Sequence, residues 1–402
     1  MFFDGLTYSS IGRNLAEGKG SFWSPYYTEF VYPTFYEHPP LAFGIQAMFF
    51  YLFGDLFFLE KLYNLLFTLS ALYFVVRLWS IFSMRRTAWF PLLLLLCIPV
   101  FHWTFKNNML EVYVTMFTLL SVIFYVNGIR NHSLLNIGLG SIWCLAAFLT
   151  KGPVGLFPLV TIIAYCWIFS VRRLMITRLL IQWTCFLIPL FLIAWFFPAS
   201  IDHMKQYFHT QVFASLQNQR EITASFRFQI LFELMLELSI PILFLILSRI
   251  NKISIERKKL KATAFLLLIG ICASVPLIIS LKQRKFYLAP SLPYYCMAVA
   301  LMSWPLIENT VDLIRQKYVN ITRLTTLAIL TGSLIIMVKN YGSISRDKEI
   351  MSCVQRLPNR EANFISKPSS ISECQNWTLV AYIMRYRKVS IYCDDLNSSL
   401  CD

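Results

Sequence analysis

Long apolar stretches separated by short polar connections fill most of the chain from residue 59 onward. Most are close to the roughly 20 residues that an α-helix needs to cross a bilayer, although some are shorter. They predict ten membrane-spanning helices, near residues 59–83, 88–105, 109–127, 134–149, 152–170, 178–197, 229–248, 262–280, 287–307 and 322–340.

The segment before this apolar region has a different pattern. Residues 6–17 carry scattered apolar positions ahead of Gly18, which predicts a short amphipathic helix lying on the membrane. Residues 19–36 are rich in Pro, Ser and Tyr and predict a loop. Residues 39–58 are apolar enough either to span or to lie partly in the interface. Because the chain starts almost directly in a polar loop, we expect a further membrane span ahead of it.

The end of the chain is polar, with a helix predicted at 377–387 and a strand at 389–392. Four of the ten cysteines lie there, and their spacing leaves open whether they form one or two disulfides or stay free thiols: Cys353, Cys374, Cys393 and Cys401. We therefore divide the chain into an outer loop with interfacial helices (1–58), a transmembrane bundle (59–342) and an extracytoplasmic tail (343–402), which we expect to be a small α/β unit.

Composition supports a membrane protein, because 57% of residues are hydrophobic and only 14% are charged, against about 25% charged in soluble domains. The net charge of +15 does not indicate a nucleic-acid partner, since the basic residues lie in short connections between apolar stretches. The chain contains no Walker loop, GxGxxG or metal-type CxxC motif.

The basic residues also predict the orientation. Alternate connections are densely basic and should face the cytoplasm; they hold Arg85, Arg86, Arg130, Arg172, Arg173, Arg178, Arg249, Lys252, Arg257, Lys258, Lys259, Lys261, Arg315, Lys317 and Arg323. The opposite set, which includes residues 1–38, 198–228 and 282–287, should lie outside together with the tail.

Two polar groups at the ends of the first outer loop are candidates for chemistry. A carboxylate such as Asp4 beside a membrane can act as a general base or orient an acceptor hydroxyl or amine; alternatively it is a solvated loop residue or a helix N-cap. Pro39 and Pro40 stiffen the chain after Glu37 and His38. Such a pair suits a divalent cation or a phosphate, unless the prolines merely start a helix.

Further candidates lie in other outer connections. Lys282, Arg284 and Lys285 precede Tyr287 and run against the positive-inside trend, which favours binding of a lipid phosphate; the alternative is contact with lipid headgroups. Glu111 and Lys151 stand at the rims of predicted spans, where ionisable residues are functional candidates. His209, in the long outer loop, is a weaker one.

These motifs, taken in order, resemble the GT-C glycosyltransferases of the ArnT and protein O-mannosyltransferase superfamily. The resemblance covers residues 1–340 and rests on Asp4-Gly5-x-x-Tyr8, Glu37-His38-Pro39-Pro40-Leu41, Thr150-Lys151-Gly152-Pro153 and Arg284-Lys285-x-Tyr287-x-x-Pro290-x-x-Pro293. It implies an all-α polytopic fold, a GT-C type helical bundle, and a sugar donor carried on polyprenyl phosphate and used without a nucleotide cofactor.

Roles follow from the resemblance position by position. Asp4 would be the catalytic carboxylate, with Glu111 as a second catalytic candidate at a position where relatives commonly have Asp. Tyr8 and Tyr36 would bind substrate. The donor phosphate would contact His38, Lys151, Arg284, Lys285 and Tyr287. Glu37 matches a metal-binding position, and His209 is added from loop placement to hold a divalent cation. Gly5 departs from relatives that have a second acid there.

We therefore expect an integral glycosyltransferase of the cell (inner) membrane. It would move a sugar by inverting transfer from a polyprenyl-phosphate donor to a lipid, glycan or protein acceptor at the extracytoplasmic face. The alternative is a transporter or flippase for polyprenyl-linked glycans, which would place polar residues in the middle of its spans. The predicted spans are largely free of them. A structural membrane protein would leave the ordered motifs as coincidence.

Overall fold

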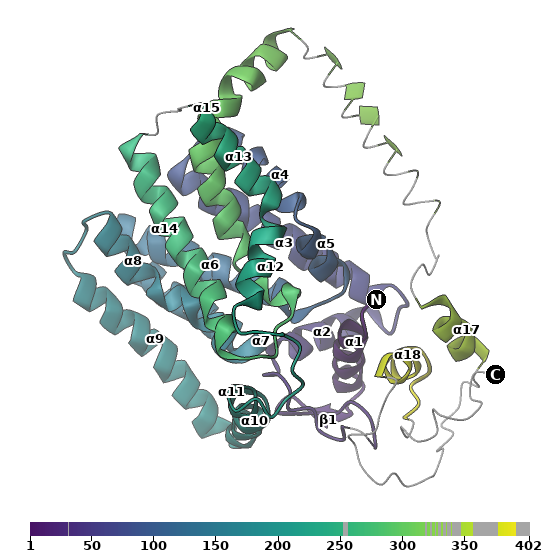
Figure 1. Ribbon diagram of the computed structural model, residues 1–402. Coiled ribbons are helices and arrows are strands. Elements are labelled where there is room, and N and C mark those ends of the chain that lie inside the picture. The colour runs from purple at the N-terminus through teal and green to yellow at the C-terminus, as the bar shows by residue number, and fades with distance from the viewer. Residues whose placement is uncertain are drawn as a thin grey trace.

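The computed structural model describes residues 1–30, 32–251, 256–317, 347–356 and 377–390, with single positions between 320 and 339. Within these residues the chain is almost entirely α-helical. Most of it forms a bundle of long helices, and the N-terminal helices lie beside that bundle together with the last helix of the chain (Figure 1). The predicted all-α polytopic fold is confirmed.

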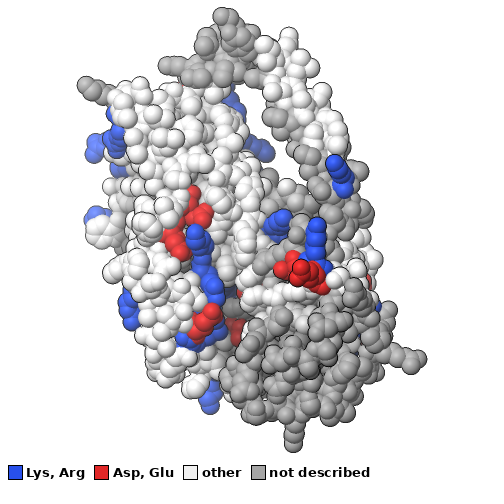
Figure 2. All heavy atoms as spheres, turned by 45° about the vertical axis from the view of Figure 1, so that its right-hand side comes forward, with Lys and Arg blue, Asp and Glu red and all other residues white. Residues whose placement is uncertain are grey.

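The bundle contains α3 (Leu59–Phe82), α6 (Leu110–Arg130), α7 (Leu134–Lys151), α8 (Thr161–Ile168), α9 (Met175–Phe196), α14 (Arg257–Ser274) and α15 (Leu292–Lys317). Helix α6 is buried along most of its length and packs against α3, α7 and α8. Helix α9 instead exposes large apolar side chains, including Leu180, Trp195 and Phe196. In Figure 2 much of the visible surface of the bundle is uncharged, apart from a central band of acidic and basic residues and basic residues near its edge; the uncharged part is expected for a surface that contacts lipid.

Five helical segments are long and apolar enough to cross a membrane: Leu59–Phe82, Leu110–Arg130, Leu134–Ile168, Met175–Phe196 and Arg257–Ile279. Two bent pairs raise the number to seven if each is one span. These counts apply to the described residues. The span predicted at 287–307 falls on the end of η5 (Lys285–Leu288) and the first part of α15, which is not among the candidates. The span at 322–340 lies largely outside the described residues.

Two predicted spans are not single helices. The 88–105 segment, preceded by η1 (Arg85–Thr87), divides into α4 (Trp89–Leu96) and α5 (Pro99–Lys106), bent by 85°. The 229–248 segment divides into α12 (Gln229–Glu237) and α13 (Ser239–Ile250), bent by 67°. In both, a proline near the start of the second helix lacks the N–H that a continuous helix needs there. The apolar pattern alone did not reveal these breaks.

The segment Leu134–Ile168 reverses direction at Gly152, between α7 and η2 (Gly152–Val160). Gly152 has a φ of 68°, a conformation that glycine adopts without strain. After the turn, the Cys144 Sγ lies 3.7 Å from the Gly155 carbonyl, although eleven residues separate them. The predicted break between the 134–149 and 152–170 segments is therefore present, and it places Lys151 at the end of α7.

The N-terminal helix α1 (Phe3–Ala16) begins three residues earlier than predicted, so Asp4 lies in its first turn and not in a loop. It does not have the free polar face expected of an amphipathic helix, since most of its residues are buried. It is buried between α2 (Leu41–Phe53) and α18 (Trp377–Arg387). Small residues explain this burial, since Gly12 lets the backbone approach Gln46 of α2. Strands β1 (Gly20–Ser21) and β2 (Ser24–Pro25) form a small antiparallel hairpin in the following loop.

The tail contributes two described helices, α17 (Lys348–Arg356) and α18, and α18 matches its predicted bounds. The two helices pack on each other, and α18 packs on α1. Val389 and Ser390 are not in a strand, and residues 391–392 lie outside the described residues. The disulfide hypothesis also falls outside them, because Cys374, Cys393 and Cys401 are not described, nor is the side chain of Cys353.

Candidate active site

Two cavities adjoin where the N-terminal segment meets the bundle. The first, ≈530 Å³, is mostly apolar. It lies among η2, η3 (Phe208–Phe213), η4 (Val275–Ile279) and the ends of α10 (Ala199–Tyr207), α11 (Ala214–Leu216) and α14. The second, ≈270 Å³, is a polar chamber that contains Asp4. Both are lined by the same group of residues, here called the shared wall: Glu37, His38, Lys151, Gln211, Arg220, Lys282 and Tyr287.

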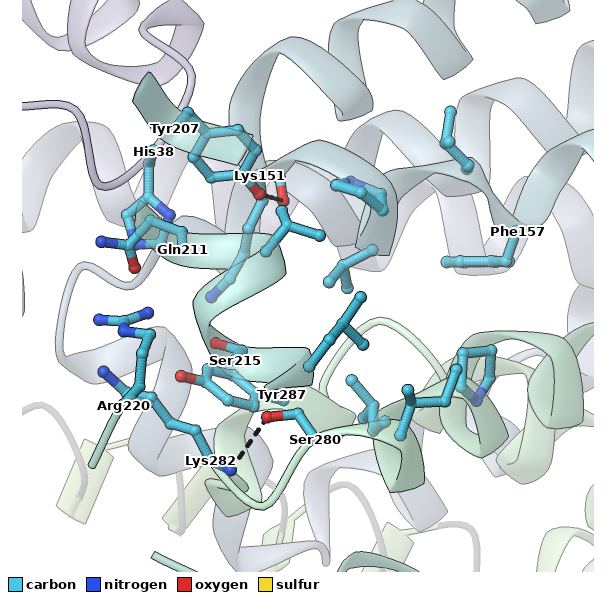
Figure 3. Close-up of a pocket in the computed structure, with 18 of the residues that line it drawn as sticks. His38, Lys151, Phe157, Tyr207, Gln211, Ser215, Arg220, Ser280, Lys282 and Tyr287 are labelled. Carbon is cyan, nitrogen blue, oxygen red and sulfur yellow. Dashed lines mark hydrogen bonds between the residues drawn. The ribbon is translucent and has the colours of Figure 1, made fainter. Parts of the chain in front are cut away.

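The shared wall brings together three cationic side chains from distant parts of the chain, Lys151, Arg220 and Lys282. Figure 3 shows them at the polar end of the larger cavity, with Phe157 at the other. Lys151 is buried and stands 4.7 Å above the ring of Tyr287. Burial and the nearby Arg220 lower the pKa of Lys282. Within the described residues, no ion pair engages Arg220 or Lys282, so their charges can meet an anionic ligand.

Lys151 is the exception, because its Nζ forms an ion pair with Glu111 Oε1 at the start of α6. Both side chains are buried, and the second oxygen of Glu111 has no hydrogen-bond partner among the described residues. Glu111 lines neither cavity. It therefore holds Lys151 in place from behind the wall. The ion pair with Glu111 offsets part of the desolvation free energy that burial of the Lys151 charge costs.

Asp4 lines the polar chamber and not the apolar cavity. Burial, and secondly the negative charge of Glu37, raise its pKa from 3.8 to about 7. The turn that carries it is fixed by the connection before α6: Phe2 N–H donates to Asn107 Oδ1 (2.7 Å), and Asn108 Nδ2 donates to the Gly5 carbonyl (3.0 Å). A Cβ at Gly5 would overlap the Asn107 carbonyl. A second carboxylate beside Asp4 has no room.

Glu37 and His38 are held by their neighbours at the start of α2. Tyr32 donates a hydrogen bond to Glu37 Oε1 (3.0 Å), and the Tyr8 hydroxyl lies 3.1 Å from His38 Nε2. The His38 carbonyl lies 3.0 Å from His203 Nε2. Burial, and then the charge of Lys151, hold the pKa of His38 well below its usual value. His38 is therefore neutral at pH 7 and acts through hydrogen bonding alone.

Several predicted residues lie elsewhere. Tyr36 packs against His203, with ring centroids 5.2 Å apart, and lines neither cavity. His209 is exposed on η3. Lys285 is exposed and lies 4.0 Å from Glu237, while Arg284 lines the chamber but pairs with Glu221 (2.9 Å). Sites of three or more His, Cys, Asp or Glu suited to a metal ion are absent from the described part of the chain.

The structure adds residues that the site predictions did not name, among them Gln211, Arg220 and Trp377, and it selects Lys282 from the predicted basic cluster. Lys282 belongs to the same basic cluster as Arg284, and the sequence of that cluster does not indicate which of its cations faces the cavities. Arg220 lies in the long loop after α9. Trp377 comes from the tail, and nothing in its sequence neighbourhood pointed to the chamber.

Two solved structures share this fold. ArnT from Cupriavidus metallidurans bound to undecaprenyl phosphate matches with a TM-score of 0.57 and 16% identity, over 87% of this chain and 63% of that chain. The apo state of the same ArnT matches with a TM-score of 0.56 and 15% identity, over 87% and 64%. The present chain thus spans less than two thirds of ArnT. No family model matches the sequence, and neither does any curated protein. The likeness shows an ArnT-like GT-C fold.

Proposed function

We propose that this chain, with its ArnT-like GT-C fold, is a membrane glycosyltransferase that takes a sugar from a polyprenyl-phosphate donor. The observation that carries the proposal is the shared wall. It places Lys151, Arg220 and Lys282 between an apolar cavity and a chamber that contains a carboxylate. A polyprenyl-phosphate sugar has the same order of parts: an apolar chain, an anion and a polar ring.

The donor fits the two cavities in one direction. Its isoprenoid units nearest the phosphate would occupy the apolar cavity, beside residues such as Leu156, Phe157 and Leu277. Its phosphate would lie at the shared wall, where cations form charge-assisted hydrogen bonds with phosphate oxygens. Its sugar would then enter the polar chamber beside Asp4. Undecaprenyl phosphate bound to ArnT is a ligand of this class.

The proposed reaction is a single inverting displacement. The oxygen or nitrogen of an acceptor hydroxyl or amine attacks the anomeric carbon, while its proton passes to Asp4. The bond from the anomeric carbon to the phosphate oxygen breaks, and the phosphate keeps the electron pair. The cations of the shared wall stabilise that developing charge. Glu111 contributes as a positioning residue, by holding Lys151.

Asp4 suits the role of general base because a base works best with a pKa near the working pH. With a pKa of about 7, Asp4 is substantially ionised at neutral pH and still basic enough to accept a proton. An ordinary aspartate, with a pKa near 3.8, would be a weaker base. The burial of Asp4 and the nearby charge of Glu37, which together raise its pKa, therefore make Asp4 a better general base at neutral pH.

A divalent cation remains part of the proposal. Mg²⁺ in phosphate sites is commonly held by one or two carboxylates together with substrate oxygens, and Glu37 is the carboxylate of the shared wall that fits this role. His209 does not line the chamber. Such a cation would add positive charge beside the donor phosphate. Loss of donor binding in EDTA, restored by Mg²⁺, would support this part of the proposal, and unchanged binding would remove it.

The location and acceptor are also proposals. The basic connections assigned to the cytoplasm support, by the positive-inside rule, a site at the extracytoplasmic face of the cell membrane. The acceptor is a lipid, glycan or protein that presents a hydroxyl or amine at that face. Cysteine-accessibility labelling at exposed residues such as His209 and Lys285 would test the sidedness, because an impermeant reagent should label both from outside.

The test of the function is transfer of radiolabelled sugar from polyprenyl-phosphate donors by purified protein, with Asp4→Asn as the variant. Asparagine keeps the shape of the side chain and removes the base, so transfer should fall by about 10²- to 10⁴-fold. Binding of polyprenyl phosphate, measured in parallel, should remain. Full transfer by a folded Asp4→Asn protein would exclude the assigned role. Donor binding without transfer by the wild type would favour a carrier instead.

A further inference from the structure

The first residue of α18, Trp377, reaches the polar chamber from the far end of the sequence. Its ring centroid lies 6.1 Å from that of Tyr32, with the two planes inclined by 33°. Tyr32 also lines the chamber, and its hydroxyl donates to Glu37. Trp377 does not line the apolar cavity. The two rings thus form one aromatic wall of the compartment that contains Asp4.

Trp377 is less enclosed than the large apolar residues in the middle of α18. Val380, Tyr382 and Ile383 are each at most 2% exposed and pack in a small core with Leu6 and α17. Trp377 packs at the edge of the same core but remains only partly buried, with surface left facing the chamber. A tryptophan needed for helix packing alone would be enclosed like its neighbours.

The position of Trp377 is fixed from the other end of α18. Arg385 forms ion pairs with Asp55 (2.6 Å) and Glu60 (2.8 Å). Arg13 of α1 donates to the carbonyls of Met384 and Arg385, in the last turn of the helix, where a cation also complements the helix dipole. Arg13, Glu60 and Arg385 are buried. The helix is therefore a rigid support, and Trp377 lies about 12 Å along it from Arg385, at 1.5 Å per residue.

We propose that Trp377, together with Tyr32, is a platform for a sugar ring in the polar chamber, and that the C-terminal segment thereby takes part in substrate selection. This inference rests on the proposed function. A sugar ring presents C–H groups on its faces and hydroxyls at its edge. A rigid aromatic surface can bury those faces at low entropic cost, while Glu37 and the cations of the shared wall are placed to meet the edge.

The sugar is that of the donor or that of a glycan acceptor, and the two are distinguished by experiment. The variants are Trp377→Ala and Trp377→Phe. Trp195→Ala is the matched control, since Trp195 is 69% exposed on α9 and lines neither cavity. Binding of undecaprenyl phosphate without sugar is compared with binding of undecaprenyl phosphates that carry a hexose, a pentose or an aminosugar. KM for the acceptor is measured separately.

Trp377→Ala should weaken binding of the best sugar-bearing donor, or raise KM for the acceptor, by about 3- to 10-fold. Its kcat and its affinity for sugar-free undecaprenyl phosphate should stay close to wild type, because the phosphate and prenyl sites do not include Trp377. Trp377→Phe should restore most of the loss, and Trp195→Ala should have no effect. A change in the donor constant alone assigns the donor sugar, and a change in the acceptor constant alone assigns the acceptor.

The proposal is overturned if Trp377→Ala leaves both sugar constants unchanged. It is also overturned if binding of sugar-free undecaprenyl phosphate weakens in parallel, since that result indicates a general disturbance of the fold. Failure of the proposed function has a different signature: wild-type protein would then transfer no sugar from any donor. In that case the ratio of affinities for sugar-bearing and sugar-free lipid still decides whether Trp377 contacts sugar.

Discussion

Two clusters of charge lie at opposite ends of α1, one including Asp4 in its first turn and the other Arg13 in its last, and they contain the same numbers of acids and bases. The first, here called the clamp, holds α18 against α1 and the start of α3; its members are Arg13, Glu17, Asp55, Glu60, Arg385 and Lys388. The second surrounds the two cavities, with Asp4, Glu37, Glu111, Lys151, Arg220 and Lys282. Each has three acidic and three basic residues.

The clusters differ in how their charges meet. In the clamp the opposite charges touch, as in Arg385 with Glu60 (2.8 Å) and Lys388 with Glu17 (2.6 Å). In the second cluster, Lys151 pairs with Glu111, whereas Asp4, Glu37, Arg220 and Lys282 form no ion pair among the described residues; Arg284 and Glu221, which also line the chamber, pair with each other and lie outside this cluster. Charges that neutralise each other hold a fold together, whereas charges kept apart around a cavity are available to a ligand. We therefore expect substitutions in the clamp to reduce stability and those in the cavity cluster to reduce binding.

The largest effect should come from breaking the clamp. Arg385→Met leaves the buried carboxylate of Glu60 without a partner, which should lower the free energy of unfolding by about 3–5 kcal/mol. Lys388→Met is the matched control, because Lys388 is 43% exposed, and an exposed pair contributes only about 0–1 kcal/mol. Thermal unfolding in detergent measures both. Equal, small losses for the two variants would mean that the clamp is not what anchors α18.

The opposite behaviour is expected at the shared wall. Arg220→Gln and Lys282→Gln each remove a cation that has no ion-pair partner in the described structure, so neither should lower the unfolding temperature. Each should weaken binding of polyprenyl phosphate by about 10- to 100-fold, the usual value of a hydrogen bond to a charged group. Lys285→Gln is the control, since Lys285 lines neither cavity. If Lys285→Gln weakens binding as much, the effect is general electrostatics.

The same contrast explains what the sequence could predict. The apolar pattern predicted the all-α fold, and ordered motifs predicted that Asp4, Glu37, His38, Lys151 and Tyr287 would gather. Each is a local signal. Helix breaks at Pro99 and Pro241 are local too, yet an apolar window averages over them. The clamp and Trp377 depend on α18 returning to α1, a contact between the two ends of the chain that no local pattern encodes.

The sequence also could not show which of several neighbouring cations would line the cavities. Lys282, Arg284 and Lys285 lie within four residues of one another, and they differ only in the direction in which their side chains point. Lys282 lines both cavities, Arg284 pairs with Glu221, and Lys285 is exposed. That direction is set by η5 and by hydrogen bonds between Gln283 and the start of α12, where Gln283 Oε1 accepts from Ile230 N–H (2.9 Å). The sequence therefore identifies the basic cluster, but tertiary packing determines that Lys282 is the residue that faces the cavities.

The smallest effect, and the sharpest test of separated charges, is a shift in the pH dependence of transfer. Asp4 must be ionised to accept a proton, so the rate should rise with pH through its pKa of about 7. Glu37 raises that pKa and Lys282 lowers it. Glu37→Gln should therefore move the rise to lower pH, and Lys282→Gln should move it to higher pH, with donor saturating. Because burial is the larger cause, the first shift should stop well short of 3.8. Shifts in the same direction would mean that Asp4 does not govern the profile.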